Sequence, residues 1–283
     1  MSGAAPYRKL ILIPTDFSRV CENAIAHGFE IARRLEYSLK VLHVVSPGAE
    51  GKNSDGWASP ATRDFRKLYT MKEPVSSSLS IRTGNLFKVI NKMAGQLHPN
   101  LMILGTHGKH GLQYLYGSYA LRVVLDAPCP VIVVHNRPVL NGYRNILVPV
   151  HGLMDACQTA LWLIRFHAVF GSRVVLFRMA EADKGVDKNL RDIQLAIGSG
   201  LTSAGVPWDA AKSNIKMDFS SQVLEMASGM CADLIMTIPG SGDYRFSFVA
   251  WNERLMFNPS QIPVMCLNQL EPDDPWCEWM AEN

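Results

Sequence analysis

Four short apolar segments of the chain occur twice, at an almost constant spacing. Pro149 closes the segment 145–149 just as Pro14, 135 residues earlier, closes the segment 9–14. The other three pairs lie 134, 133 and 133 residues apart: 39–42 with 173–176, 100–103 with 233–236, and 130–133 with 263–266. This spacing is far longer than the unit of a solenoid, so each copy is a complete domain. The chain is predicted to contain two tandem copies of one fold.

The first copy predicts strands that alternate with helices. Runs rich in Val, Ile and Leu are typical of strands buried on both faces, and amphipathic stretches follow them. We expect strands at residues 9–14, 39–45, 79–82, 101–104 and 131–134. We expect helices that begin near Ser18, Asn85 and Ser118, and one more at 61–71. Such alternation implies right-handed crossovers and a covered parallel sheet. The fold class is α/β, with an open five-stranded parallel sheet in each copy.

The boundary between the two copies is expected near residue 138. Residues 136–143 contain Pro and Gly and are typical of a linker, so the domains are predicted at 1–138 and 139–283. The last strands of the copies, 131–134 and 264–267, would each leave a sheet edge uncovered, which proteins avoid. The two halves are therefore expected to pair as an internal pseudo-dimer, and a homodimer of whole chains stays open.

Composition restricts the class of protein. The net charge is only +3, so no nucleic-acid partner is implied. No run approaches the ~18 apolar residues that span a bilayer, and the N-terminus lacks the apolar core of a signal peptide. The six cysteines form no CxxC pair and lie mostly in apolar runs, which favours buried, reduced thiols. We expect a cytoplasmic protein without membrane contact.

A glycine-rich loop is the most distinctive chemical feature. It follows the strand at 101–104 and contains glycines at positions 105, 108, 111 and 117. Glycine backbones can converge on a phosphate, and the next helix adds its positive N-terminal end. No Asp or Glu lies between Gly105 and Leu125, whereas Lys109 and Arg122 are positive. These features favour an anion site, although a tight turn that only packs well would also use glycines.

The loop matches neither common phosphate signature. A P-loop requires Ser or Thr after its Gly-Lys pair, and here His110 follows Lys109. The dinucleotide fingerprint fails too, because Gly240 and Gly242 are followed by Arg245 where the third glycine belongs. A nucleotide site here is of a third kind.

The order of motifs resembles the universal stress protein family, in its tandem form. The resemblance rests on three segments: Pro14-Thr15-Asp16-Phe17-Ser18, Leu42-His43-Val44, and the loop from Gly105-Thr106-His107-Gly108 to Gly117-Ser118. It covers nearly the whole chain, and more of the motifs lie in the first half. It implies an adenine-nucleotide alpha hydrolase-like, Rossmann-like fold in each copy.

The resemblance also implies a site for ATP, alone or with Mg²⁺, at the carboxyl ends of the strands. Asp16 would accept hydrogen bonds from the ribose or adenine, and the main chain of Val44 would hold the adenine edge. Two residues would shape the pocket: Pro14 and Thr15. Three would surround the phosphates and three would close over them: Gly105, His107 and Gly108, then Gly117, Ser118 and Tyr119. No metal ligands of the protein's own are implied.

One departure from the family pattern keeps two functions open. Nucleotide-binding members have nine residues between the second and third glycines, whereas eight separate Gly108 from Gly117. Gly111 could absorb the deletion, or the cradle could be too narrow for a triphosphate. The first hypothesis is a stress-response protein that binds ATP or a related adenine nucleotide and acts through protein contacts. The alternative is a nucleotide-independent interaction module. An enzyme ranks last, because neither a nucleophile elbow nor paired carboxylates occur.

The second copy keeps the strands and loses the site residues. At the offset of 135 residues, His151 replaces Asp16. Pro239, which has no backbone N–H to donate, opens the second loop. Acidic and aromatic side chains follow it: Asp243, Glu253, Phe246, Phe248 and Trp251. We expect side chains to fill this pocket, and at most one nucleotide per chain.

The segment 271–279 is acidic and holds two Trp residues. Exposed aromatic residues often mark contact sites, so the segment could dock a partner protein, whose identity the sequence does not give. It could also pack back on its own domain, which is the interpretation we favour.

Overall fold

The computed structural model divides the chain into two compact units, Met1–Val139 and Leu140–Asn283, here called unit 1 and unit 2. The structure describes residues 8–46, 75–106, 117–152, 154–239, 251 and 253–268. The helix expected at 61–71 lies outside these residues.

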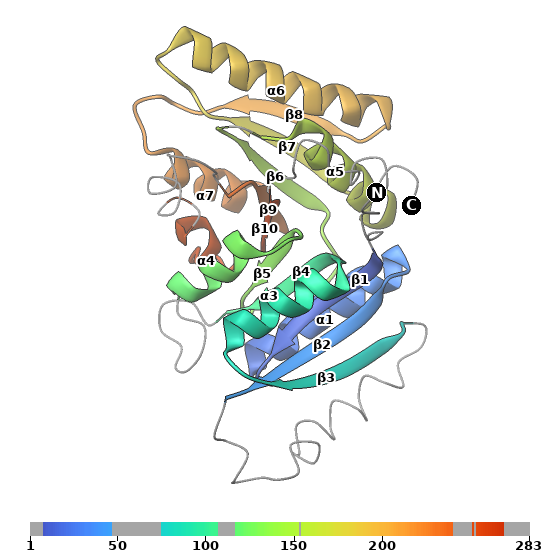
Figure 1. Cartoon of the computed structure of the whole chain (residues 1–283). Helices are drawn as coiled ribbons and strands as arrows, with labels where there is room; N and C mark the ends of the chain where they lie inside the picture. The colour runs from blue at the N-terminus through green and yellow to red at the C-terminus, as the bar shows by residue number, and fades with distance from the viewer. Residues whose placement is uncertain are drawn as a thin grey trace, which may run out of the picture. The chain divides into compact units, whose positions relative to one another are not determined.

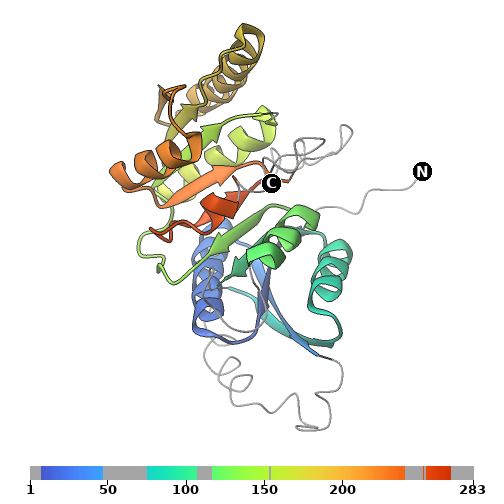
Figure 2. The same cartoon turned by 90° about the vertical axis from the view of Figure 1, so that its left-hand side faces the viewer.

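Unit 1 contains a five-stranded parallel sheet in the order β3-β2-β1-β4-β5 (Figure 1). Its strands are β1 (Arg8–Thr15), β2 (Ser38–Val45), β3 (Ser77–Thr83), β4 (Pro99–Gly105) and β5 (Val131–Val134). Helix α1 (Arg19–Leu35) covers one face, and α3 (Leu86–Leu97) and α4 (Gly117–Asp126) cover the other (Figure 2). From β1, the chain builds first toward β3 and then returns to add β4 and β5. The strand order therefore reverses between β1 and β4, which is where open α/β sheets bind ligands.

The buried faces of these elements follow the sequence pattern. All seven residues of β4 are buried, as expected for a central strand of a parallel sheet. Helix α1 turns an apolar face inward, and five of its buried residues are Cys21, Ala24, Ile25, Gly28 and Ala32. The helix ends at Glu36, whose backbone is left-handed. The hydroxyl of Tyr37, the next residue, donates to Asn100 Oδ1 at 3.0 Å and ties this corner to β4.

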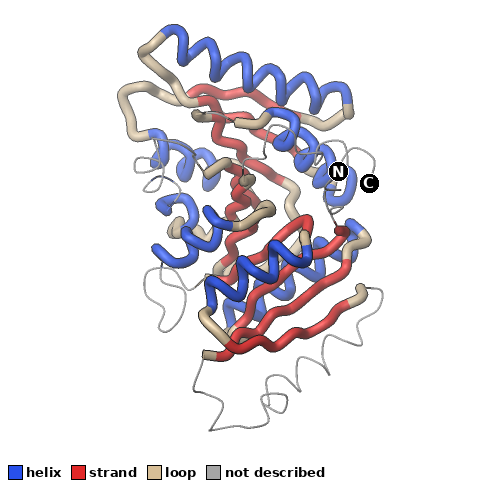
Figure 3. The backbone as a smooth tube through the Cα atoms, viewed as in Figure 1, coloured by secondary structure: helices blue, strands red, loops and turns tan. Residues whose placement is uncertain are grey.

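Unit 2 repeats the alternation of strands and helices (Figure 3), with its strands in the order β10-β9-β6-β7-β8 (Figure 1). Its strands are β6 (Asn145–Val150), β7 (Arg173–Arg178), β8 (Trp208–Lys212), β9 (Leu234–Thr237) and β10 (Val264–Cys266). Its helices are α5 (Ala156–Phe170), α6 (Lys184–Ser203) and α7 (Phe219–Gly229). Pro149 aligns with Phe177 in the neighbouring strand as Pro14 aligns with Leu42. The predicted α/β fold in two tandem copies is confirmed. The strand pairing relates β1 to β6 and β2 to β7 by the same offset of 135 residues.

Helix α1 begins directly after Ser18, as predicted, although the Ser18 hydroxyl makes no capping hydrogen bond. The expectation of buried thiols is wrong for two cysteines: among those of the described residues, Cys21, Cys129 and Cys266 are buried free thiols, whereas Cys157 and Cys231 are exposed. The two exposed thiols lie at helix ends, where an apolar neighbourhood in sequence does not ensure burial. No helix in the described part of the chain is long and apolar enough to cross a membrane.

Candidate functional site

The candidate site lies where β1, β2 and β4 of unit 1 end. Thr15, the last residue of β1, is buried and pairs with His43 of β2. The His43 ring nitrogen Nδ1 lies 2.8 Å from the Thr15 carbonyl oxygen, so this histidine holds two strand ends together. Val44 follows it, half-buried, at the same edge of the sheet. Pro14 precedes Thr15 within the buried part of β1.

Asp16 sits in a tight turn directly after β1. Its side chain is exposed, and Oδ1 accepts a hydrogen bond from the Ser18 backbone N–H at 2.9 Å. Thr15 Oγ1 accepts the Phe17 N–H, also at 2.9 Å. Phe17 has a φ of 62°, an uncommon conformation for a residue with a side chain, and its ring packs 4.9 Å from that of His43. Side-chain contacts thus fix the turn and place the Asp16 carboxylate at the sheet edge.

The Cys21 thiol lies beneath this turn, in contact with Asp16 and Ser18. Burial raises the pKa of the Cys21 thiol to about 12, and the negative charge of Asp16 adds to the effect. The thiol is therefore protonated at neutral pH and is a poor nucleophile. It acts as a small apolar floor under the turn.

The exit of β4 is packed tightly against the start of α1. A Cβ atom on Gly105 would lie 2.8 Å from the Val20 carbonyl oxygen and 3.2 Å from Cys21 Cα. Only glycine allows the strand and the helix backbone to approach so closely. For Gly105, the packing interpretation of the glycines is therefore supported, whether or not a ligand is bound.

Thr106 follows Gly105 and is almost fully buried. Its N–H donates to the Val134 carbonyl at 3.0 Å, and its own carbonyl lies 2.8 Å from His135 Nδ1. Its hydroxyl is buried and makes no hydrogen bond within the part of the chain that the structure describes. Buried hydroxyls normally have a partner, and a ligand oxygen or a water is a suitable one.

The remaining predicted residues belong to the glycine loop. His107 and Gly108 lie outside the described residues. Gly117, Ser118 and Tyr119 form the first turn of α4, one residue ahead of the predicted start. Arg122 lies on the exposed surface of α4, where it pairs with Asp126 at 3.7 Å.

Sequence reasoning missed three side chains at this edge. None of the Cys21 thiol, the Thr106 hydroxyl and the His135 ring was predicted to belong to the site. Thr106 belongs to the motif Gly105-Thr106-His107-Gly108, so the sequence could have indicated its place in the site. The His135 contact depends on how β4 and β5 align, and a local pattern carries no such information.

Aromatic side chains occupy the corresponding edge of unit 2. His151, the counterpart of Asp16, is buried, and its Nε2 lies 3.2 Å from Thr237 Oγ1. Its ring centroid is 4.0 Å from that of Trp251. Trp251 stacks on Phe219, and Phe219 stacks on Phe177, with centroid distances of 6.0 and 5.5 Å. The prediction of a filled pocket is supported for Trp251, whereas Phe246, Phe248 and Asp243 lie outside the described residues.

Burial also fixes the protonation of His151. It lowers the pKa of the imidazole from its usual 6.5 to about 4, so the side chain is neutral at physiological pH. A neutral, buried imidazole against an indole replaces the exposed carboxylate of unit 1. The hydrogen-bonding chemistry of the two edges is therefore different.

Two further features lie away from this edge. An open pocket of about 490 Å³ occurs at the amino ends of β1 and β2, lined by residues that include Lys9, Arg33 and Tyr37. None of the predicted site residues lines it. Within the described residues, His, Cys, Asp and Glu side chains form no group of three that could hold a metal ion.

Known proteins share this architecture. A family model described as "Universal stress protein family" matches residues 7–135. A universal stress protein of Methanocaldococcus jannaschii is 32% identical over 145 residues, which are 47% of this chain and 85% of that protein. A universal stress protein A homolog of Coxiella burnetii is 30% identical over 138 residues, 44% of this chain and 95% of that protein.

Solved structures extend the similarity to both halves. The crystal structure of a universal stress protein from Archaeoglobus fulgidus covers 95% of this chain and 99% of its own, with a TM-score of 0.68 and 13% identity. Two structures similar to half of the chain are a universal stress protein in complex with cAMP (TM-score 0.36, 16% identity, 47% of this chain and 100% of that one) and an Archaeoglobus fulgidus protein in complex with dAMP (TM-score 0.35, 19% identity, 44% and 98%). By sequence and by fold, this chain belongs to the universal stress protein family.

Proposed function

We propose that this protein binds an adenine nucleotide, ATP or a close relative, at the carboxyl edge of the unit 1 sheet. One observation carries the proposal: the folded chain brings Asp16, Val44 and the β4 exit together at the reversal of strand order. The first turn of α4 follows a loop without acidic residues, and a helix N-terminus favours an anion.

The residues present suit such a ligand. The exposed Asp16 carboxylate is a hydrogen-bond acceptor for ribose hydroxyls, and the Val44 main chain can pair with the adenine edge. The buried Thr106 hydroxyl, without a partner among the described residues, supplies a further polar group at the β4 exit. The backbone of the glycine loop and the N–H groups at the start of α4 would hold the phosphates, with Mg²⁺ as an additional counter-ion.

We infer binding rather than catalysis as the role of the site. A hydrolase needs a group that activates water or attacks phosphorus. The protonated Cys21 thiol cannot do so, and Asp16 is a weak base on an exposed turn. The bound nucleotide would instead set the state in which the protein contacts its partners, as part of a stress response.

The alternative function, a nucleotide-independent interaction module, has its own supporting observation. Gly105 is required by the contact with Val20 and Cys21 alone, so its presence does not by itself argue for a ligand. The eight residues between Gly108 and Gly117 also leave the phosphate cradle one residue shorter than the family pattern.

Two measurements on the full chain separate these functions. Mass spectrometry of small molecules released from freshly purified protein should detect an adenine nucleotide, and calorimetric titration should give binding for ATP, ADP or AMP. A variant with one glycine inserted after Gly111 restores the family spacing. If the natural loop is too short for a triphosphate, the insertion should tighten ATP binding and leave AMP binding unchanged. Absence of binding in both proteins would favour the nucleotide-independent module.

A further inference from the structure

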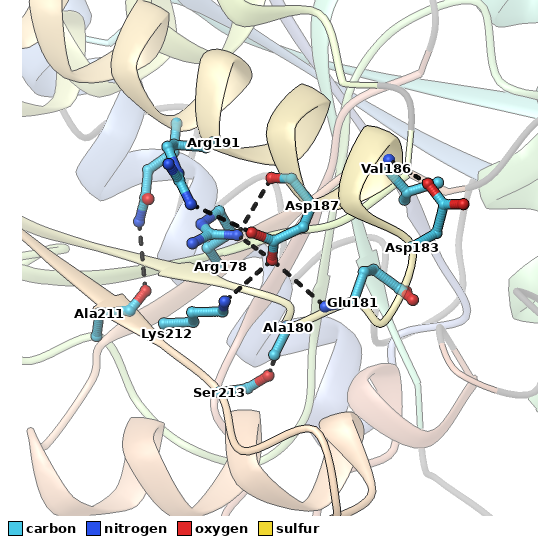
Figure 4. Close-up of polar contacts among 11 residues, drawn as sticks. Arg178, Ala180, Glu181, Asp183, Val186, Asp187, Arg191, Ala211, Lys212 and Ser213 are labelled. Atoms are coloured by element: carbon cyan, nitrogen blue, oxygen red, sulfur yellow. Dashed lines mark hydrogen bonds and ion pairs between the residues drawn. The ribbon is translucent and has the colours of Figure 1, made fainter.

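The carboxyl ends of β7 and β8 in unit 2 hold a group of positive side chains around one carboxylate (Figure 4). Arg178 ends β7, Lys212 ends β8, and Asp187 lies in the first turn of α6. Asp187 Oδ1 accepts a hydrogen bond from Arg178 Nη1 at 2.6 Å and lies 3.1 Å from Lys212 Nζ. Arg191, one helical turn further on, reaches Asp187 Oδ2 at 3.4 Å. Three cations therefore share a single carboxylate.

This arrangement leaves positive charge at the surface. Hydrogen bonds from Arg178 and Lys212 hold the pKa of the Asp187 carboxyl well below its usual range, so it contributes one full negative charge. Within this group of four side chains the three cations exceed that charge by two, and the carboxylates of Glu181 and Asp183 lie beside the group (Figure 4). The side chains of Arg191 and Lys212 are 58% and 46% exposed, so the excess charge is accessible. The nearby Asp183 caps α6 through the Val186 N–H at 2.9 Å.

Two large apolar side chains lie in the turn that follows Lys212. Ile215 and Met217 are 53% and 52% exposed. Asn214 accepts two hydrogen bonds that hold this turn. Its carbonyl accepts the Met217 N–H at 3.2 Å, and its side chain accepts the Lys216 N–H at 3.0 Å. Covering these two side chains would remove apolar surface from water, which is favourable. We call Arg178, Arg191, Lys212, Ile215 and Met217 together the β7–β8 rim.

The last part of the chain has the complementary composition. Fifteen residues, 269–283, follow the last described residue, Asn268. They contain five acidic side chains and no Lys or Arg: Glu271, Asp273, Asp274, Glu278 and Glu282. Two Trp residues, Trp276 and Trp279, alternate with these acids, and Pro272 and Pro275 favour an extended backbone. The segment thus offers both negative charge and aromatic surface.

The register of the unit 2 sheet brings this segment close to the rim. Cys266 of β10 aligns with Thr237, and the pairing continues through β6 to Phe177 of β7 and Ala211 of β8. The chain therefore leaves β10 at the same edge where Arg178 and Lys212 stand. Three to four strand spacings, about 14–19 Å, separate β10 from β7 and β8. The stretch from Asn268 to Trp279 can extend roughly 36 Å, so the rim is within reach.

We propose that residues 271–279 dock on the β7–β8 rim of their own unit. The acidic side chains would meet Arg191 and Lys212, and the indoles would cover Ile215 and Met217. The docked segment neutralises the excess charge and removes the two apolar side chains from water. This inference is independent of nucleotide binding in unit 1.

A disulfide trap in the full chain tests the docking, because Cys277 is a native thiol of the segment. In Ile215→Cys, mild oxidation should link residue 215 to Cys277 within one chain, as read by peptide mapping of the monomer band. The matched control is Leu195→Cys, in the middle of α6, which is similarly exposed at 57%. The link at 215 should form about tenfold faster or more, because docking raises the local concentration of the thiol.

Charge changes then separate docking from chance collision. Combined D273N and D274N substitutions in the Ile215→Cys chain should slow disulfide formation several-fold. Salt at about 0.5 M should slow it as well, because it screens the attraction between the acidic segment and the exposed cations. Circular dichroism checks that each variant is folded. Equal rates at positions 195 and 215 would overturn the proposal. A 215–277 link found only between two chains would also overturn it, and would indicate that a second copy covers the rim.

Discussion

At the scale of single residues, Asp16 is the side chain on which nucleotide binding should depend most. Replacing it with Asn keeps an oxygen that can accept the Ser18 N–H and so preserves the turn. The substitution removes the charge and the acceptor that a ribose would use. We expect nucleotide affinity to fall by about 1–3 kcal/mol, measured by calorimetric titration, with an unchanged melting temperature.

The matched control for this variant is Asp126→Asn, on α4 of the same unit. Asp126 is exposed and contacts Arg122 on the surface of the helix. Affinity should stay as in the natural protein. If the Asp16→Asn protein binds the nucleotide as tightly as the Asp126→Asn protein, Asp16 does not belong to the site.

Two buried histidines give the fold a distinctive pH dependence. Burial lowers the pKa of His27 from 6.5 to about 4, although the hydrogen bond to the Arg137 carbonyl partly offsets it, and burial lowers the pKa of His151 likewise. Both are neutral in the folded state, whereas the unfolded chain protonates them below pH 6.5. The two histidines should therefore leave the free energy of unfolding unchanged between about pH 6.5 and 8, and it should fall between pH 6.5 and 4. The loss at pH 5 is on the order of 2 kcal/mol for each histidine.

Denaturant titrations at several pH values measure this loss. The depressed carboxyl pKa values of Asp187 and Asp218 act in a separate window, below about pH 4. His27→Gln retains a donor for the Arg137 carbonyl, which lies 3.1 Å from His27 Nε2. This variant should lose about half of the decline between pH 6.5 and 5. An identical pH profile in the variant would contradict the role assigned to His27.

At the scale of elements, the contact between the β4 exit and the first turn of α1 sets the shape of the candidate site. Gly105→Ala places a methyl group 2.8 Å from the Val20 carbonyl oxygen, so the helix must shift. We expect a loss of about 1–3 kcal/mol in stability and weaker nucleotide binding, because the Asp16 turn leads into α1. Thermal melting and calorimetric titration measure the two effects.

Gly95→Ala is the control for this prediction. Gly95 lies in α3, and a Cβ atom there would meet nothing within 4 Å. Alanine favours a helix interior over glycine by about 1 kcal/mol, so this variant should be slightly more stable and should bind normally. A Gly105→Ala protein as stable as Gly95→Ala would show that the contact does not constrain α1.

Most elements could be predicted from the sequence because their signals are local. Asn85 was expected to begin a helix, and its side chain accepts the Lys88 N–H at 3.2 Å. Segments such as 131–134 are uniformly apolar, and β5 occupies those residues. Contacts between distant segments carry no local signal. The Gly105–Val20 approach and the cations around Asp187 depend on strand register and helix placement, which repeats and periodicity do not give.

At the scale of the whole molecule, one fold occurs twice with different chemistry. The internal repeat was readable because strand-forming residues recur at fixed spacing, and the strand orders of the two units match. The pairing of the halves as a pseudo-dimer stays a prediction. The position of Asp16 in unit 1 and His151 in unit 2 shows where the copies have diverged. A buried core tolerates few changes, whereas a sheet edge can lose its ligand groups without loss of the fold.

This divergence predicts one nucleotide per chain. In unit 2, His151 packs against Trp251 and contacts Thr237, so a neutral imidazole stands where unit 1 has the Asp16 carboxylate. Ile238 and Pro239 stand where unit 1 has Gly105 and Thr106, and Pro239 cannot donate a backbone hydrogen bond. Calorimetric titration of the full chain should therefore give a stoichiometry near one.

The Asp16→Asn substitution should weaken nucleotide binding at this single site, and no second site should be detected. His151→Asp should not create a site, because the Trp251 indole still packs against this position. A stoichiometry near two, or one full equivalent bound at natural affinity by the Asp16→Asn chain, would show that unit 2 binds nucleotide after all.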